Sequence, residues 1–125
     1  MADDAVQQVL FSNEAFYLAF SGKDIDAMDG LWSRQAPLVC VHPGWRRLTD
    51  REEILDSWRR ILSNPDQPGM DFLHPVVHDL GSSKLVTCYE ALPSGVCLAT
   101  NGFVEEDDGW RMVLHHSGAC AQPIE

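Results

Sequence analysis

The sequence predicts a single α+β domain in which helices cover one face of an antiparallel sheet. Up to Asn64, apolar residues recur in three stretches at the three- and four-residue spacing of one helix face. From Met70 onward, apolar and polar residues alternate as they do in strands. Short Gly- and Pro-containing turns separate these strands, and such turns join antiparallel neighbours. A chain of 125 residues is large enough for one core, so residues 1–125 are expected to form one domain.

The first helix is predicted from Asp4 to Ser21, and Gly22 ends it. Its buried stripe consists of Val6, Val9, Leu10, Phe16, Tyr17 and Phe20. Asn13 lies in the middle of this stripe, and a buried amide needs hydrogen-bond partners. It therefore either bonds a neighbouring backbone group or faces a polar cavity.

Two shorter helices follow, each with its own start signal. Asp24 is a suitable N-cap for the second helix. The inner face of that helix is Ile25, Met28, Leu31 and, at its end, Trp32. Thr49 and Glu52 have the spacing of a capping box, which predicts a third helix that stops at Asn64. Its buried stripe is Ile54, Leu55, Trp58, Ile61 and Leu62. A tryptophan on such a stripe is more often a core residue than a platform for a ligand, and both roles are open for Trp58.

Alternating patterns predict five strands: Leu38–His42, Met70–Leu80, Lys84–Ala91, Val96–Glu106 and Trp110–Ala119. Pro75 has no backbone N–H, so its strand is expected at an edge of the sheet or with a bulge. His42 ends the first strand, where side chains commonly reach a cleft, although a hydrogen-bonded structural histidine is the more frequent case.

The last strand carries apolar residues on both sides of its alternation. Trp110, Met112, Leu114 and His116 fall on one side, and Arg111, Val113, His115 and Ser117 fall on the other. A strand that is apolar on both faces must be covered on both. The chain's own helices can cover one face, and we expect a second copy of the protein to cover the other, in a homodimer through the sheet face.

The charge and the N-terminus exclude several classes of protein. A formal net charge of −10 repels nucleic acid and anionic membranes, so neither is expected as a partner. No run approaches the ~20 apolar residues of a membrane span, and the acidic start is unlike a signal peptide. We therefore expect a cytoplasmic protein. Five arginines cluster in one region: Arg46, Arg47, Arg51, Arg59 and Arg60. They indicate either a solvated helix face, which is the favoured interpretation, or attraction for an anionic ligand near a pocket.

The four cysteines, Cys40, Cys88, Cys97 and Cys120, are far apart in sequence, with no CxxC pair among them. We expect them to be reduced packing residues that form no disulfide and bind no metal. The sequence has no Gly-rich phosphate loop and no paired-carboxylate metal signature, so no cofactor is expected.

The order of the elements and three local motifs resemble the SnoaL-like branch of the nuclear transport factor 2-like superfamily, over nearly the whole chain. The motifs are the strand end His42-Pro-Gly-Trp45, the capped helix from Arg51 to Trp58, and the closing stretch from Asp-Gly-Trp110 to His-His-Ser-Gly118. The last stretch is also similar to the end of the calcium/calmodulin-dependent protein kinase II association domain. Here, however, the two histidines are adjacent, and Gly102 stands where that domain has a pocket arginine.

The resemblance implies a cystatin-like cone, in which a curved antiparallel sheet wraps around the long first helix and leaves a pocket at its open end. It also implies that two sheets pack together in a homodimer. The superfamily contains isomerases, dehydratases, cyclases, epoxide hydrolases and non-catalytic binding or assembly domains, so the fold alone assigns no activity.

Candidate site residues follow from the chemistry that such a pocket needs, which is a base facing a hydrogen-bond donor. His42 and His116 are the candidate catalytic bases, and the sequence leaves open whether His115 or His116 faces the pocket. Candidate ligand-binding residues are Asn13, Tyr17, Trp32, Trp45, Trp58, Glu90 and Asn101; Glu90 is also a candidate base, and Tyr17 and Asn101 are candidate donors. Two functions are predicted as alternatives. One is a small-molecule binding protein or enzyme with an apolar or aromatic ligand in the cone. The other is a non-catalytic association domain.

Overall fold

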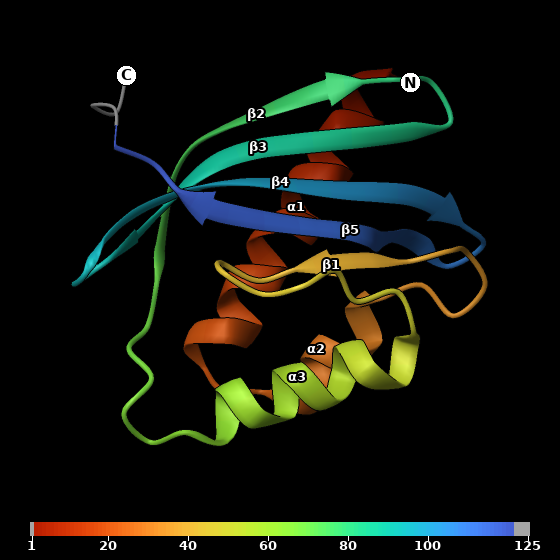
Figure 1. Cartoon of the computed structure of the whole chain (residues 1–125). Helices are drawn as coiled ribbons and strands as arrows, with labels where there is room; N and C mark the ends of the chain where they lie inside the picture. The colour runs from red at the N-terminus through yellow and green to blue at the C-terminus, as the bar shows by residue number, and fades with distance from the viewer. Residues whose placement is uncertain (1, 122–125) are drawn as a thin grey trace.

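The computed structural model describes residues 2–121 and has the predicted α+β architecture, with three helices. In chain order the elements are α1 Ala2–Ser21, α2 Ile25–Leu31, β1 Val39–Val41, α3 Arg51–Ser63, β2 Asp71–Asp79, β3 Ser83–Leu92, β4 Gly95–Glu106 and β5 Gly109–Ala119. Figure 1 shows α1 passing behind the sheet across its strands, with α2 and α3 below β1. Among the described residues, none of the helices is both long enough and apolar enough to traverse a lipid bilayer.

The sheet has five strands in the order β1-β5-β4-β3-β2. Strands β2 to β5 are antiparallel neighbours, as the short turns predict. The prediction of a wholly antiparallel sheet is wrong at one edge, because β1 pairs with β5 in parallel. This pairing is possible because α3 and the whole of β2 to β4 lie between the two strands in sequence, which gives the chain room for a crossover.

Helix caps explain where the shorter helices start. Asp24 caps α2 as predicted, since its Oδ1 accepts a hydrogen bond from the backbone N–H of Ala27. The cap of α3 is Asp50 and not the predicted Thr49, because the Asp50 carboxylate accepts from the backbone N–H of Glu53 at 3.1 Å. A carboxylate is a stronger acceptor than a hydroxyl beside the positive end of a helix.

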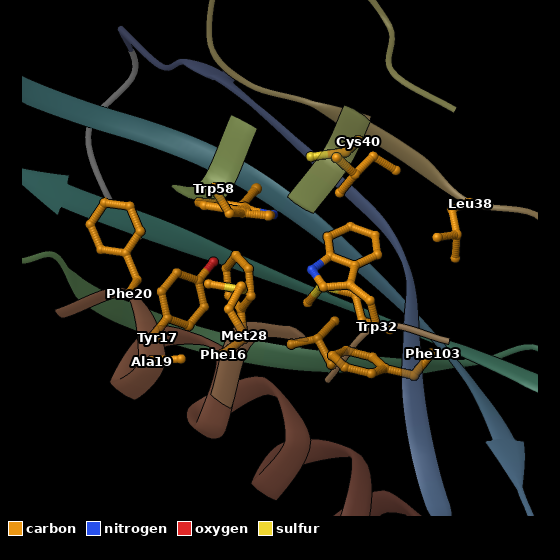
Figure 2. Close-up of a cluster of buried hydrophobic side chains, with 14 of the residues drawn as sticks. Phe16, Tyr17, Ala19, Phe20, Met28, Trp32, Leu38, Cys40, Trp58 and Phe103 are labelled. Carbon is orange, nitrogen blue, oxygen red and sulfur yellow. The ribbon is translucent and has the colours of Figure 1, made fainter. Parts of the chain in front are cut away.

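The core lies between α1, α2, α3 and the inner face of the sheet. Figure 2 shows Phe16, Tyr17 and Phe20 projecting from α1 toward Trp58, and the rings of Phe16 and Trp58 meet edge to face at 5.4 Å. Trp32 and Trp58 are 1% and 2% exposed, so both tryptophans belong to the core. Such aromatic contacts stabilise a core beyond the area that they bury.

Strand β2 is both an edge strand and irregular, as Pro75 predicts. The register with β3 shifts between Leu73 and Val76, and His74 has a positive φ of 54°. An edge strand tolerates a proline, because β2 has no neighbour on its outer side that would need a backbone N–H from it.

A bulge in β5 overturns one prediction that concerns the site. Gly102 and Phe103 are consecutive on β4, but their partners on β5 are Leu114 and Met112, so Val113 has no partner. An extra residue reverses the alternation of everything after it. Met112 is buried, and beyond the bulge it is His115 that is buried, whereas His116 is exposed on the opposite face.

Candidate functional site

A cavity of about 260 Å³ opens where α1, α3 and the loop after β1 meet strands β3 and β5. Its lining is Phe20, His42, Pro43, Trp45, Trp58, Ile61, Gln67, Met70, Glu90, Leu92 and His115. Most of these residues are apolar or aromatic, and His42, Glu90 and His115 are buried polar groups. The larger hollow of about 540 Å³ beside Arg34 and Arg111 lies on the charged surface, and its lining includes no buried histidine or carboxyl group. We therefore take the smaller cavity as the candidate site.

His42 follows β1 directly and is held by α3. Its Nε2 lies 2.8 Å from Ser57 Oγ, and this hydroxyl donates to the carbonyl oxygen of Ile54 at 2.6 Å. The imidazole packs edge to face against Trp45 and Trp58, with ring centres 4.8 and 4.6 Å away. Burial lowers the pKa of His42 to about 4, so its ring is neutral at pH 7.

His115 projects inward from β5, and its Nδ1 lies 2.7 Å from Asn101 Oδ1 on the neighbouring strand β4. Its ring centre is 6.2 Å from that of His42. Burial is the main cause that lowers the pKa of His115 to about 3, with smaller contributions from His42 and His116. The cavity therefore contains two neutral imidazoles at pH 7.

Glu90 is the one carboxyl group in the cavity wall, and it is 2% exposed. Its Oε1 accepts from the Ser117 hydroxyl and its Oε2 accepts from the Tyr17 hydroxyl, each at 2.6 Å. Burial raises the pKa of Glu90, and the two hydrogen bonds oppose this by stabilising the anion. The pKa of Tyr17 is raised as well, first by burial and then by the charge of Glu90.

A buried amide pair lies behind the cavity and joins α1 to the sheet. Asn101 Nδ2 donates to Asn13 Oδ1 at 2.9 Å and to the Tyr17 hydroxyl at 3.1 Å. Asn13 thus meets neither of its two predicted environments, because its partner is a side chain across the core. Cys88 Sγ lies 3.2 Å from the Tyr17 hydroxyl at the edge of this network.

The structure brings most of the sequence-predicted site residues to one place. His42, Trp45, Trp58 and Glu90 line the cavity, whereas Asn13, Tyr17 and Asn101 form the hydrogen-bonded layer behind it. Trp32 is not in the cavity wall; it is buried at the other end of the core, where it bridges to Met112.

His116 is the prediction that the structure corrects, because the bulge at Val113 turns it to the outer face. The sequence leaves open whether His115 or His116 faces the pocket, and the structure places His115 there. Ser117 and Ser57 are the residues that the sequence reasoning missed. The alternation along β5 places Ser117 on the same face as His115. No feature of that pattern indicates the bulge, which turns both residues inward.

The arginine cluster is largely paired. Arg46 pairs with Glu53, Arg51 with Asp29 and Arg59 with Asp56. Arg60 lies over the ring of Trp45, with its Cζ 5.9 Å from the ring centre. The exposed pairs of Arg46 and Arg59 agree with the interpretation as a solvated helix face, whereas the Arg51 side chain is only 19% exposed and ties α3 to Asp29 of α2. Within residues 2–121, no three His, Cys, Asp or Glu side chains are grouped so that they could hold a metal ion, and none of the four cysteines forms a disulfide.

Known proteins show the same fold. A protein of the NTF2-like family from Streptomyces avermitilis, provisionally named a dehydratase, is 30% identical with a TM-score of 0.89, covering 98% of this chain and all (100%) of that chain. A protein from Thiobacillus denitrificans, provisionally named a calcium/calmodulin-dependent protein kinase type II association domain, is 28% identical with a TM-score of 0.76, covering 87% of this chain and 92% of that one. A cystatin-like fold protein from Burkholderia xenovorans has a TM-score of 0.80 at 20% identity, covers 96% of this chain and 95% of that one, and shows the fold alone.

A curated relative extends the comparison to plants. The F-box protein SKIP8 of Arabidopsis thaliana is 29% identical over 113 residues, which are 87% of this chain and 48% of that protein. The chain thus spans about half the length of this relative. The family model of the SnoaL-like domain matches residues 9–122, which include α1 from Val9 onward, all the later elements and every side chain of the cavity. The chain therefore belongs to the family of SnoaL-like domains within the NTF2-like superfamily.

Proposed function

We propose that the protein binds a small, uncharged and largely apolar organic molecule in this cavity. The observation that carries the proposal is the cavity's wall, which combines aromatic and aliphatic side chains with three buried polar groups and no arginine or lysine. Both imidazoles are neutral at pH 7 and no basic side chain lies in the wall to pair with an anion, so the site disfavours an anionic ligand. Aromatic walls favour a flat apolar body.

The same groups support isomerase-, cyclase- or dehydratase-type chemistry. A neutral imidazole can take a proton from the ligand and return it at another position. Burial provides this condition here, because it keeps His42 and His115 unprotonated. His42 and His115 are the proposed bases, and His115 takes the role first given to His116. The dehydratase name of the Streptomyces avermitilis relative agrees with proton transfer of this kind.

A ligand-binding screen with a cavity-filling variant tests this proposal. Leu92 lines the cavity, so Leu92→Trp should fill part of it and abolish stabilisation by ligands. Leu98 is 44% exposed on the outer face, so Leu98→Trp is the matched control and should keep that stabilisation. The measurement is the thermal shift with small aromatic and terpenoid-like compounds at high concentration, because stabilisation grows only logarithmically above Kd. Equal shifts for wild type and Leu92→Trp would show that the ligand binds elsewhere.

A second function, as a homo-oligomeric association domain, is favoured by the outer face of the sheet. Leu73, Val76 and Leu98 are exposed there by 37%, 52% and 44%. We propose that a second copy of the chain covers this face in a homodimer, which for an obligate interface would bury more than ~2,000 Å² in total. The two functions are compatible, since the cavity and the outer face lie on opposite sides of the sheet. A ligand that stabilises the protein would support the binding function, and the absence of any such ligand would favour the association function.

A further inference from the structure

The hydrogens of the Asn101 amide decide how the cavity can bind a ligand. Asn101 Nδ2 uses both of its hydrogens, one to Asn13 Oδ1 and one to the Tyr17 hydroxyl. The Tyr17 hydrogen is itself committed to Glu90 Oε2 at 2.6 Å. If the Asn101 amide were turned over, its oxygen would face a Tyr17 hydroxyl that has no hydrogen left to donate. The network therefore fixes Asn101 with its Oδ1 toward His115.

This orientation fixes the tautomer of His115. An amide oxygen can only accept, so His115 Nδ1, at 2.7 Å, must carry the hydrogen of that bond. Because the ring is neutral at pH 7, its Nε2 then carries a lone pair and no hydrogen. Within the described part of the chain, this Nε2 has no hydrogen-bond partner. This nitrogen is not completely enclosed by protein. The completely enclosed polar side-chain atoms without a partner are Asn13 Nδ2 and the indole Nε1 of Trp32, Trp58 and Trp110. His115 lines the cavity, so its bare nitrogen is open to a ligand.

His42 also donates its single N–H group to the protein, but from the other ring nitrogen. Ser57 gives its hydrogen to the Ile54 carbonyl, so its oxygen accepts from His42 Nε2 at 2.8 Å. His42 then carries its lone pair on Nδ1. Each of the two imidazoles in the cavity wall thus donates its N–H group within the protein. Its other ring nitrogen can only accept a hydrogen bond.

We infer that the cavity selects a ligand that bears a hydroxyl group, as an alcohol, a phenol or an enol, and that this hydroxyl donates to His115 Nε2. The inference rests on the proposed function and narrows its ligand class. An ether or a ketone of the same shape offers no hydrogen, so it would leave the buried nitrogen unpaired, and a carboxylate would bring a negative charge into a wall that holds Glu90 and no basic side chain. Asn101 and Asn13 are the positioning residues of this arrangement, since they act only through His115.

The tautomer can be measured on the wild-type protein without any ligand. Long-range ¹H–¹⁵N correlation spectra of the imidazoles at pH 7 should show His115 with a protonated Nδ1 and a bare Nε2. A neutral histidine ring free in water prefers the opposite tautomer, so the exposed His116 is an internal reference. The imidazole signal that is missing from the spectrum of His115→Phe is assigned to His115. Asn101→Leu should return the ring to mixed tautomers, and Asn101→Asp, which keeps an acceptor at this place, should restore the wild-type form. A His115 ring with its hydrogen on Nε2 in the wild type would overturn the inference.

A matched series of compounds tests the ligand class. We would titrate 2-naphthol, 2-methoxynaphthalene and naphthalene against wild type, His115→Phe and His116→Phe. One hydrogen bond to a buried acceptor corresponds to about tenfold in Kd, so wild type should prefer 2-naphthol by about that factor. His115→Phe should lose the preference, and His116→Phe, the same change on the outer face, should keep it.

The outcomes separate the two proposals. Equal binding of all three compounds by the wild type would leave the apolar-ligand function standing and overturn the hydroxyl selection. Binding of none of them would count against the proposed function and, with it, against this inference.

Discussion

The Tyr17 hydroxyl donates to Glu90 Oε2 at 2.6 Å although the two residues are 73 positions apart in the chain. Tyr17 belongs to α1 and Glu90 to β3, so this bond ties the first helix to the sheet at the wall of the cavity. It also orders the side chains around it, because it uses the tyrosine hydrogen and leaves the tyrosine oxygen to accept from Asn101.

Removing a hydroxyl that donates to Glu90 should destabilise the fold. Tyr17→Phe and Ser117→Ala each delete one of the two donors and leave a buried carboxylate oxygen less satisfied. The expected loss is about 1–3 kcal/mol of unfolding free energy, measured by urea denaturation. Ser63→Ala is the control, because it removes an exposed hydroxyl that donates only to the backbone of its own helix. Losses no larger than in this control would mean that the network contributes nothing to stability.

Stability should fall as the pH is lowered from 6.5 to 4.5. Burial lowers the pKa of His42 to about 4 and that of His115 to about 3, from an ordinary value of 6.5. In this window the unfolded chain binds protons that the folded protein does not, at about 1.4 kcal/mol per pH unit for each histidine. Glu90 acts in the opposite direction, since its raised pKa destabilises the fold as the pH rises above 4.5.

Urea denaturation from pH 7.5 to 4.5 measures this dependence. His115→Phe should flatten the curve, and His116→Phe, on the exposed face, should leave its slope unchanged. A wild-type curve that stays flat between pH 6.5 and 4.5 would contradict the burial of two neutral imidazoles.

A side chain at position 102 should be poorly tolerated. A Cβ on Gly102 would lie 3.0 Å from Leu114 Cβ and 3.3 Å from Leu85 Cδ2. Gly102→Ala should therefore cost about 1–3 kcal/mol. The matched control is Gly118→Ala in the same sheet, where a Cβ would meet nothing within 4 Å. If both substitutions have the same effect on the urea midpoint, the close approach at Gly102 does not constrain the sheet.

A charge on the outer face should dissociate the proposed homodimer. Leu98→Lys places an ammonium group in the middle of the apolar surface formed by β2, β3 and β4, whereas Leu18→Lys makes the same change at a site that is 65% exposed on α1. Light scattering at micromolar concentration should give a doubled mass for wild type and Leu18→Lys, and a single mass for Leu98→Lys. A wild type of single mass that is stably folded would refute the dimer.

Element types, and most of the boundaries, could be predicted from the sequence because they depend on local signals. The stripe of α1, the cap at Asp24 and the turns between strands each specify their structure within a few residues. The parallel pairing of β1 with β5 could not be predicted, since nothing within Leu38–His42 indicates which strand will be its neighbour.

The candidate site was predictable in its aromatic wall and less so in its polar groups. His42, Trp45 and Trp58 lie near signals that place them, namely a strand end and a helical stripe. The inward position of His115 depends on the one-residue bulge at Val113, next to the close approach of Leu114 to Gly102 on the neighbouring strand. The period-2 pattern of β5 alone does not indicate this bulge, so it does not decide which of His115 and His116 faces the pocket.

The cavity has two walls of different construction. His115, Glu90 and the network behind them are held by the long strands β3, β4 and β5 and by α1. His42, Trp45 and Trp58 belong instead to the segment that runs from the end of β1 through α3, which joins the sheet through a strand of only three residues. Substitutions in this segment can remodel the shape of the cavity while His115 and Glu90 keep their partners. Related domains could therefore change their ligands by changing one wall alone.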